Sequence, residues 1–402
     1  NEATGNVEQL PGIITDSSPI GGASELSATY SSIIAELTKI GYKDNVDLFS
    51  VGYNYYLHPV TSFSVYDELK EKIEDVYNTT QEKAIFISFD QGASFTSIFL
   101  SNYSSSEWTK EYIEKVIFLA PSFAGIPIFQ QLFNQSIDSF PESDEMKKTI
   151  SMMPGLHMML PNYHVFQHKT IIYNLYSIFD QYNASYSFEF LKMQGKVDEE
   201  AESVFRSCAE KYLKEPIPEP PVPSLIIYND GITQNVSYVV NHQLNTVTSI
   251  YDNPGDGTIT SEGAEYACKN WDSSTCRNLH NSIRHDQITS TATVIQYVVK
   301  YIQSNDDENS HKNHAVFLAS GFAGSPLYAT ITDATKATMC PLNLSNYLIY
   351  NTFIKNLYRF IDDSDSSSWL KDECISYITN TELNEKKTGV SFSKGVILNS
   401  SK

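Results

Sequence analysis

The sequence predicts an α/β fold, in which helices cover both faces of a mostly parallel sheet that carries cap and lid insertions. Short runs of β-branched and aromatic residues alternate with segments of helical periodicity over much of the chain. This alternation is typical of a doubly wound sheet. With 402 residues and 41% hydrophobic content, the chain can bury the core of one large domain or of two average ones.

The most informative stretch is 83–101, KAIFISFDQGASFTSIFLS. It predicts a buried strand, a tight corner with small residues at Ser88 and Gly92, and then a helix. This layout is that of the nucleophile elbow of an α/β-hydrolase. Esterases and lipases carry a serine at the tip of the elbow, whereas the tip here is Asp90, and the sequence contains no GxSxG.

The remaining elements follow in chain order. Apolar spacing predicts a helix over 26–41 that ends at a glycine, a strand within 46–56, an amphipathic helix over 64–80, a short polar helix over 107–115 and a buried strand opening 115–127. The alternation then fails over 130–223, which is rich in aromatic residues and Met and reads as a cap insertion. A core strand returns within 222–232, and the polar segment 304–314 precedes a fresh strand.

Composition excludes some classes of protein. Twenty-eight basic against 48 acidic residues give a net charge of −20, which repels phosphate backbones and argues against nucleic acid as a partner. No run of about 18 apolar residues predicts a membrane span. The first residues lack the basic and apolar regions of a signal peptide, so we expect that none was present or that it has been removed.

Cysteines and sequons point to an oxidising compartment. Disulfides fit the five cysteines better than zinc does, because no CxxC pair or His at ligand spacing accompanies them, and we expect no metal and no cofactor. Proximity in sequence favours Cys268 with Cys276. Seven Asn-x-Ser/Thr sequons lie at Asn78, Asn102, Asn134, Asn183, Asn235, Asn343 and Asn399, although a chain rich in Asn and Ser produces several by chance.

Three residues form a candidate catalytic set. Asp90, Asp256 in GDGT and His285 in RHDQ occur in the chain order nucleophile, acid, histidine of α/β-hydrolases. Taken singly, Asp256 could be a turn former and His285 a surface histidine, and the adjacent Asp286 is a weaker candidate acid. A carboxylate can attack alkyl carbon, but on an ester it would form an anhydride that collapses backward. If Asp90 is buried beside the other two, the carboxylates favour a protonated imidazole and a structural ion pair.

These residues lie in segments that resemble the lecithin:cholesterol acyltransferase and lysosomal phospholipase family. AIFISFDQGASFTSIFLSN is similar to the family's strand and elbow VVLVAHSMGN, VIFLAPSFAGIP to its SLGAPWGG loop, and PGDGTIT to its catalytic-acid loop GDGTV. VFLASGFAGSPLYATI resembles the oxyanion strand VLVPGxxGSxLEA, which family members place first and this chain places last. The order implies a circular permutation across the linker 304–314. A processed precursor would look the same, and a tandem repeat is less favoured because the first block would lack its oxyanion strand.

The resemblance assigns roles to residues. Asp256 would orient the imidazole, His285 would be the general base, and the backbone amides of Phe322 and Gln91 would form the oxyanion hole. The pair Cys340 and Cys374 would close the lid. The chain departs from the family where Asp90 replaces the serine and Phe89 the preceding histidine, and where Tyr53-Asn54-Tyr55-Tyr56 stands for the Tyr-Asp-Trp-Arg motif.

The expected organisation and function follow from this assignment. The segments are a core with the elbow (1–129), a cap insertion (130–223), a core part with the acid and His loops (224–303), a linker (304–314), the oxyanion strand (315–335), a lid or membrane-proximal subdomain (336–380) and a tail (381–402). We expect a pseudoenzyme that binds a lipid or fatty-acyl ligand in a lidded apolar cleft, or a protein partner, with peripheral contact to a membrane or lipoprotein surface. The alternative is an active lipid hydrolase using Asp90, His285 and Asp256. The resemblance implies a secreted or lumenal location.

Overall fold

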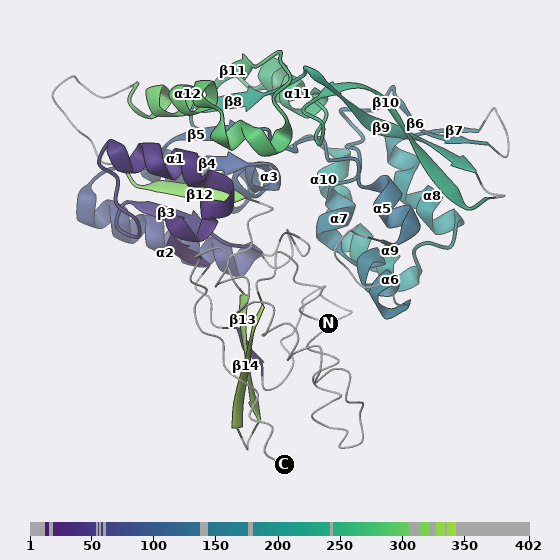
Figure 1. The fold of residues 1–402 in the computed structure, drawn as a ribbon, viewed down its shortest axis with the longest axis horizontal. Helices are drawn as coiled ribbons and strands as arrows, with labels where there is room; N and C mark the ends of the chain where they lie inside the picture. Colours follow the sequence, from purple (N-terminus) through teal and green to yellow (C-terminus); the bar gives the residue numbers. More distant parts are fainter. Residues whose placement is uncertain are drawn as a thin grey trace, which may run out of the picture. The chain divides into compact units, whose positions relative to one another are not determined.

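The structure is a computed structural model (Figure 1) that describes residues 13–15, 19–53, 55, 58, 62–136, 144–175, 180–241, 244–304, 314–320, 327–333 and 336–342. The expected roles of Phe322, Asn54, Tyr56, Asn343 and Asn399 therefore lie outside the described residues, as do the pairing of Cys340 with Cys374, most of the linker and the tail 381–402. The chain divides into two compact units, which we describe separately: residues 19–323 with 2–6, and residues 7–18 with 324–402 and residue 1.

The larger unit is built on a seven-stranded sheet in the order β11-β8-β5-β4-β12-β3-β2. Its strands are β2 (Ile20–Gly22), β3 (Leu48–Val51), β4 (Ala84–Phe89), β5 (Ile113–Leu119), β8 (Ser224–Tyr228), β11 (Ser274–Asn278) and β12 (Val316–Ser320). Every neighbouring pair is parallel except β2 with β3. The predicted mixed α/β fold with a mostly parallel sheet is confirmed.

Helices cover both faces of this sheet (Figure 1). They are α1 (Ser27–Lys39), α2 (Ser62–Thr80), α3 (Gln91–Ile98), α4 (Ser106–Tyr112), α11 (Glu262–Asn270) and α12 (Ala292–Ile302), with the shorter turns η1 (Ala23–Leu26), η2 (Phe99–Tyr103) and η5 (His285–Ser290). Side chains alternate along each strand. Ile85 and Ile87 of β4 therefore pack in one core with α1 and α12, whereas Phe86 contacts Phe99 and Phe317 on the opposite face.

The position of β12 in the sheet is set by its pairing with two strands from the first quarter of the chain. Residues 316–319 pair with β3 on one side, and residues 316–320 pair with β4 on the other. The strand is fully buried, as its unbroken apolar run predicts. The strand next to the elbow therefore comes from near residue 320.

A second sheet, in the order β10-β9-β6-β7, lies in the cap part of the same unit. Two of its strands are β6 (Thr170–Asn174) and β7 (Gln181–Asn183). The same part of the chain contains α5 (Phe129–Asn134), α6 (Asp144–Ser151), α7 (Pro154–Met158), η3 (Ala184–Tyr186), α8 (Ser187–Met193), α9 (Glu199–Val204), η4 (Phe205–Ala209) and α10 (Glu210–Lys214). The hairpin of β9 (Ile232–Asn241) and β10 (Thr246–Gly255) joins β6 in this sheet, although the sequence placed it with the core. Residues 251–255, which lead into the expected catalytic-acid loop, belong to β10 and pair with β9.

The smaller unit is described by three strands. β13 (Leu327–Asp333) pairs antiparallel with both β1 (Ile13–Thr15) and β14 (Lys336–Leu342). The sequence assigned 315–335 to one core strand, whereas the structure has β12 in the central sheet and β13 in this separate one. No helix in the described ranges is long and apolar enough to cross a membrane.

Candidate active site

The corner between β4 and α3 has the backbone geometry of an elbow. Asp90 has φ 56° and ψ −125°, a conformation that non-glycine residues rarely adopt. Its amide donates to the carbonyl of Leu119 on β5 at 3.1 Å, which holds the tip over the sheet. A Cβ at Gly92 would collide with the backbone carbonyl of Ala319 on β12. The small residue at that position is therefore required by the close approach of α3 to β12.

Asp256 follows β10 directly and is fixed by its own turn. Its Oδ1 accepts hydrogen bonds from the amides of Thr258 at 2.9 Å and Ile259 at 2.7 Å. This is the local bonding expected of an aspartate that forms a turn. The turn leaves Oδ2 to bond a second group. Asp256 can therefore form the turn with one oxygen and orient another side chain with the other.

His285 begins η5, and two hydrogen bonds tie it to Asp256. Its amide donates to the Asp256 carbonyl at 2.9 Å, and its Nδ1 lies 2.7 Å from Oδ2 of the same residue. The ring of Phe89 stacks on the imidazole with centroids 4.6 Å apart. The histidine is therefore held at its edge and on one face, with Nε2 on the side away from Asp256.

Asp90 lies on the Nε2 side of this imidazole. Its Oδ2 is 3.9 Å from Nε2, which is ion-pair distance but too long for a hydrogen bond. The exposed fractions of Asp90, Asp256 and His285 are 1%, 3% and 7%. Among the described residues, neither carboxylate oxygen of Asp90 has a hydrogen-bond partner. The structure thus brings together the three residues that the sequence selected.

The charge of His285 follows from these contacts. Burial lowers the pKa of the imidazole, but the hydrogen bond and negative charge of Asp256 and the charge of Asp90 outweigh burial and raise the pKa to about 10. The electron-rich face of the Phe89 ring, which stacks on the imidazole, further stabilises the cationic form of His285. Both carboxylates therefore favour the protonated form of the imidazole.

Only one half of the expected oxyanion hole can be placed. Gln91 is the first residue of α3, where backbone amides have no partner within the helix. Its side-chain Nε2 donates to the carbonyl of Tyr55 at 3.3 Å. Phe322 lies outside the described residues.

Two tyrosines near the elbow were not predicted as site residues. The hydroxyl of Tyr30 donates to the carbonyls of Ala319 at 2.7 Å and Ile87 at 3.2 Å, so it bridges β12 and β4 below the elbow. The ring of Tyr53 stacks on Phe95 at 4.1 Å, and burial, followed by the charge of Asp90, raises the pKa of its phenol. The period of the 26–41 helix predicts that Tyr30 is buried, but it says nothing about the partner of the hydroxyl.

The described residues also bear on the disulfide and the sequons. The expected bond between Cys268 and Cys276 is confirmed, and Cys208 is a buried free thiol. Four sequon asparagines are exposed, namely Asn78, Asn102, Asn134 and Asn183. Asn235 is 5% exposed and donates to Ser249, so the folded chain has no room for a glycan there. No group of three His, Cys, Asp or Glu side chains in the described part of the chain is placed to hold a metal ion.

The fold and site together define the class of protein. A mostly parallel sheet, a strained elbow after a central strand, and an acid and a histidine that meet above it are the arrangement of an α/β-hydrolase. Residues 15–213 match the family model of lecithin:cholesterol acyltransferase. This stretch is just under half of the chain and includes the elbow but neither Asp256 nor His285. The expected resemblance to that family is confirmed over these residues.

Solved structures with a similar fold are distant in sequence. The mature lipase BlEst2 of Bacillus licheniformis has 12% identity, with 70% of this chain and 88% of that one covered and a TM-score of 0.33. The carboxylesterase CesB of Bacillus subtilis has 13% identity, covers 71% and 82%, and has a TM-score of 0.32. Likeness at this level carries no argument about function. No curated protein matches the chain in sequence.

Proposed function

We propose that this protein is a lipid-binding α/β-hydrolase similar to lecithin:cholesterol acyltransferase, in which a carboxylate has replaced the serine nucleophile and turnover has been lost. The observation that carries the proposal is Asp90 at the strained tip of the elbow, on one side of a buried His285 that has Asp256 on its other side, so that two carboxylates raise the pKa of the imidazole. A general base must be neutral to accept a proton. An imidazole with a pKa of about 10 already carries a proton at neutral pH and cannot accept one from a nucleophile.

The chemistry of an aspartate nucleophile supports the same conclusion. If Asp90 attacked an ester, the tetrahedral intermediate would collapse back to the ester rather than on to an anhydride, because the carboxylate leaves more readily than the alkoxide. If it attacked alkyl carbon, Asp90 would become an uncharged ester, which removes one of the two charges that raise the pKa of His285, and the imidazole would then have to activate water to cleave that ester. An active hydrolase that uses Asp90, His285 and Asp256 is the alternative outcome of the test below.

The direct test is to restore the serine. Asp90→Ser removes one of the two carboxylates that raise the pKa of His285 and places a hydroxyl at the elbow. We expect turnover of a p-nitrophenyl fatty-acyl ester by Asp90→Ser, and none by the wild type or by the matched Asp90→Ala variant. His285→Ala in the Asp90→Ser background should abolish the new activity.

Two results would contradict the proposal. Turnover by the wild type that is lost in Asp90→Ala would favour the aspartate enzyme. A folded Asp90→Ser protein with no activity would refute the idea that only the nucleophile was lost.

The ligand that we propose is a lipid or fatty-acyl chain in an apolar cleft covered by the lid segment. The match of residues 15–213 to a family that acts on lecithin supports this assignment. Contact with a membrane or lipoprotein surface, or with a protein partner, belongs to the same proposal. Native mass spectrometry after mild extraction should detect a co-purifying lipid, and its absence would count against a lipid ligand.

We further propose that the chain is circularly permuted relative to this family. The support is the place of β12, which comes from residues 316–320 and yet lies between β4 and β3 beside the elbow. A strand that family members contribute at their start is therefore contributed here after the acid and the histidine. A processed precursor with its pieces in this order remains the alternative, and the intact mass of the natural protein would distinguish the two.

A secreted or lumenal location is proposed from the disulfide and the exposed sequons. Disulfides persist in oxidising compartments, and the bond between Cys268 and Cys276 fits one. Asn78, Asn102, Asn134 and Asn183 are accessible for glycosylation. We expect the natural protein to lose mass on endoglycosidase treatment, with no glycan at Asn235. An unchanged mass would argue against passage through the secretory pathway.

A further inference from the structure

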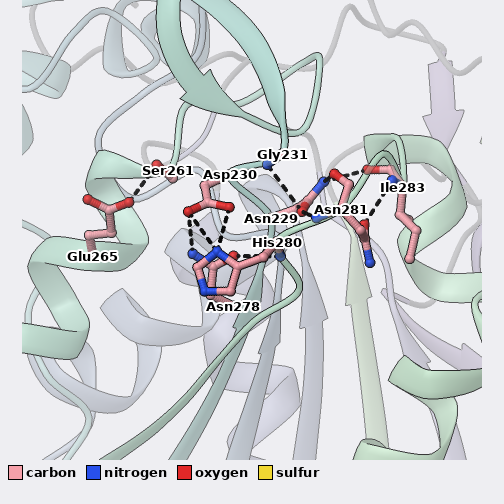
Figure 2. A network of polar contacts seen from close by, with 9 residues as sticks. All are labelled: Asn229, Asp230, Gly231, Ser261, Glu265, Asn278, His280, Asn281 and Ile283. Atoms are coloured by element: carbon pink, nitrogen blue, oxygen red, sulfur yellow. Dashed lines mark hydrogen bonds and ion pairs between the residues drawn. The ribbon is translucent and has the colours of Figure 1, made fainter.

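The loop that delivers His285 to the site is bonded to the chain segment that follows β8 (Figure 2). Residues 279–284 connect β11 to η5, and the segment Asn229–Gly231 follows β8, the strand next to β11 in the sheet. The His285 amide and the His285 Nδ1 both form hydrogen bonds with Asp256. The contacts that hold residues 279–284 in place therefore also limit where the imidazole of His285 can lie.

The Asn229 side chain uses its full hydrogen-bonding capacity on this region. Its Nδ2 donates to the carbonyls of Asn281 at 2.9 Å and Ile283 at 2.8 Å. Its Oδ1 accepts from the amides of Asn281 at 3.1 Å and Gly231 at 3.3 Å. A primary amide has two donor hydrogens and two acceptor lone pairs, so no capacity is left over. The side chain is 2% exposed, so water cannot readily replace these bonds.

The two residues after Asn229 hold the same loop. A Cβ at Gly231 would overlap the carbonyl of Asn281, so the backbones pass at a distance that only glycine allows. The Asp230 carboxylate accepts from Asn278 Nδ2 at 2.7 Å and faces His280 Nδ1 at 2.9 Å. His280 has φ 48°, an unfavourable conformation that persists only where its surroundings impose it.

We propose that Asn229 is a positioning residue for His285, and that the segment Asn229–Gly231 sets the place of the imidazole between Asp256 and Asp90. The bonded carbonyl of Ile283 is two residues from His285, which leaves at most about 7 Å of chain between the fixed point and the histidine Cα. Without the Asn229 bonds the loop could shift, and an Nδ1 contact of 2.7 Å with Asp256 tolerates little displacement. The inference goes beyond the proposed function, because it concerns what holds His285 whether or not the site turns over substrate.

The test is an NMR titration of the His285 imidazole in the full chain with Asp90 in place, with His285→Gln used to assign the resonance. Asn229→Ala removes all four bonds. Asn229→Asp keeps the volume and the acceptors but replaces the two donors with an oxygen that repels both carbonyls. In both variants we expect the pKa of His285 to fall by at least about one unit, a tenfold change in the protonation equilibrium. The control is Asn270→Ala, which removes an exposed amide bonded to Tyr266 and should leave the titration unchanged.

Two results would overturn the inference. One is a pKa of His285 equal to that of the wild type in folded Asn229→Ala and Asn229→Asp. The other is loss of the folded state in both variants, which would make Asn229 a requirement for folding rather than for the placement of His285. The measurement needs no turnover, so an inactive Asp90→Ser protein would contradict the proposed function without affecting this result.

Discussion

Asp90 combines two unfavourable features at one residue, a left-handed backbone angle and a buried carboxylate without a direct hydrogen bond among the described residues. Such features persist where the surrounding structure imposes them, and they cluster at functional sites. Here the neighbouring imidazolium supplies the compensating charge at 3.9 Å. The tip of the elbow is therefore one half of an ion pair with the protonated His285.

Gly92 offers a residue-scale test of the elbow. Gly92→Ala should lower the free energy of unfolding by about 1 to 3 kcal/mol, because the new Cβ would overlap the Ala319 carbonyl on β12, and neither backbone can move cheaply. Chemical denaturation measures the difference. In the control Gly21→Ala the new methyl meets only the flexible end of Glu25, and we expect a smaller loss. Equal effects of the two substitutions would contradict the tight packing of α3 against β12.

The sequence could select residues that stand in a recognisable local pattern, but not residues whose hydrogen bonds form only across the folded chain. Asp256 and His285 stand in turn-rich and polar loops in the order that hydrolases use, so the sequence selected both. Asn229 lies in the same kind of loop, but its role depends on carbonyls more than 50 positions later. The Asn229 side chain can bond to this loop only because β8 and β11 are neighbours in the folded sheet, which the sequence does not show.

At the scale of elements, α11 and β11 are tied together at the edge of the central sheet. The bond between Cys268 and Cys276 closes a loop of eight residues in sequence separation. Loop-closure entropy predicts a stabilisation of roughly 2 to 3 kcal/mol for a loop of this size. We expect the double variant Cys268→Ser/Cys276→Ser to lose that amount in chemical denaturation.

A reductant provides the matched control for the disulfide. It should destabilise the wild type by about this amount more than the double variant, because a bond between Cys340 and Cys374 would be reduced in both proteins and cancels from the difference. Cys208 is a free thiol in both proteins and cannot produce the difference. A wild type that is insensitive to the reductant would show that the bond does not form.

Hydrophobic periodicity located the buried strands of the central sheet but not the strands whose formation depends on a partner elsewhere in the chain. The buried runs that became β4, β5 and β8 are short, apolar and bounded by turns, and the sequence located all three. The β9–β10 hairpin was assigned to the core because it follows a core strand. Its pairing with β6 depends on tertiary contacts that the local sequence does not reveal. Polar stretches such as 251–255 are strand only because a partner lies beside them.

At the scale of the molecule, the order of strands in the central sheet is the main finding that the sequence could predict only by resemblance. No local signal places β12 between β3 and β4, because 232 residues separate the starts of β4 and β12 (316 − 84 = 232). The similarity of its segment to an oxyanion strand predicted that it belongs to the core. In the structure, residues 316–320 pair in parallel with β4, the strand that leads into the elbow.

The central claim is that two carboxylates keep His285 protonated and so remove the general base. An NMR titration of the His285 imidazole in the wild-type protein tests it most directly, with Asp286→Asn as a control for the exposed neighbouring carboxylate. We expect a midpoint near pH 10, with the ring protonated at pH 7, and a lower midpoint in Asp90→Asn. A wild-type midpoint near the ordinary value of about 6.5 would contradict it, because the histidine would then be free to act as a base.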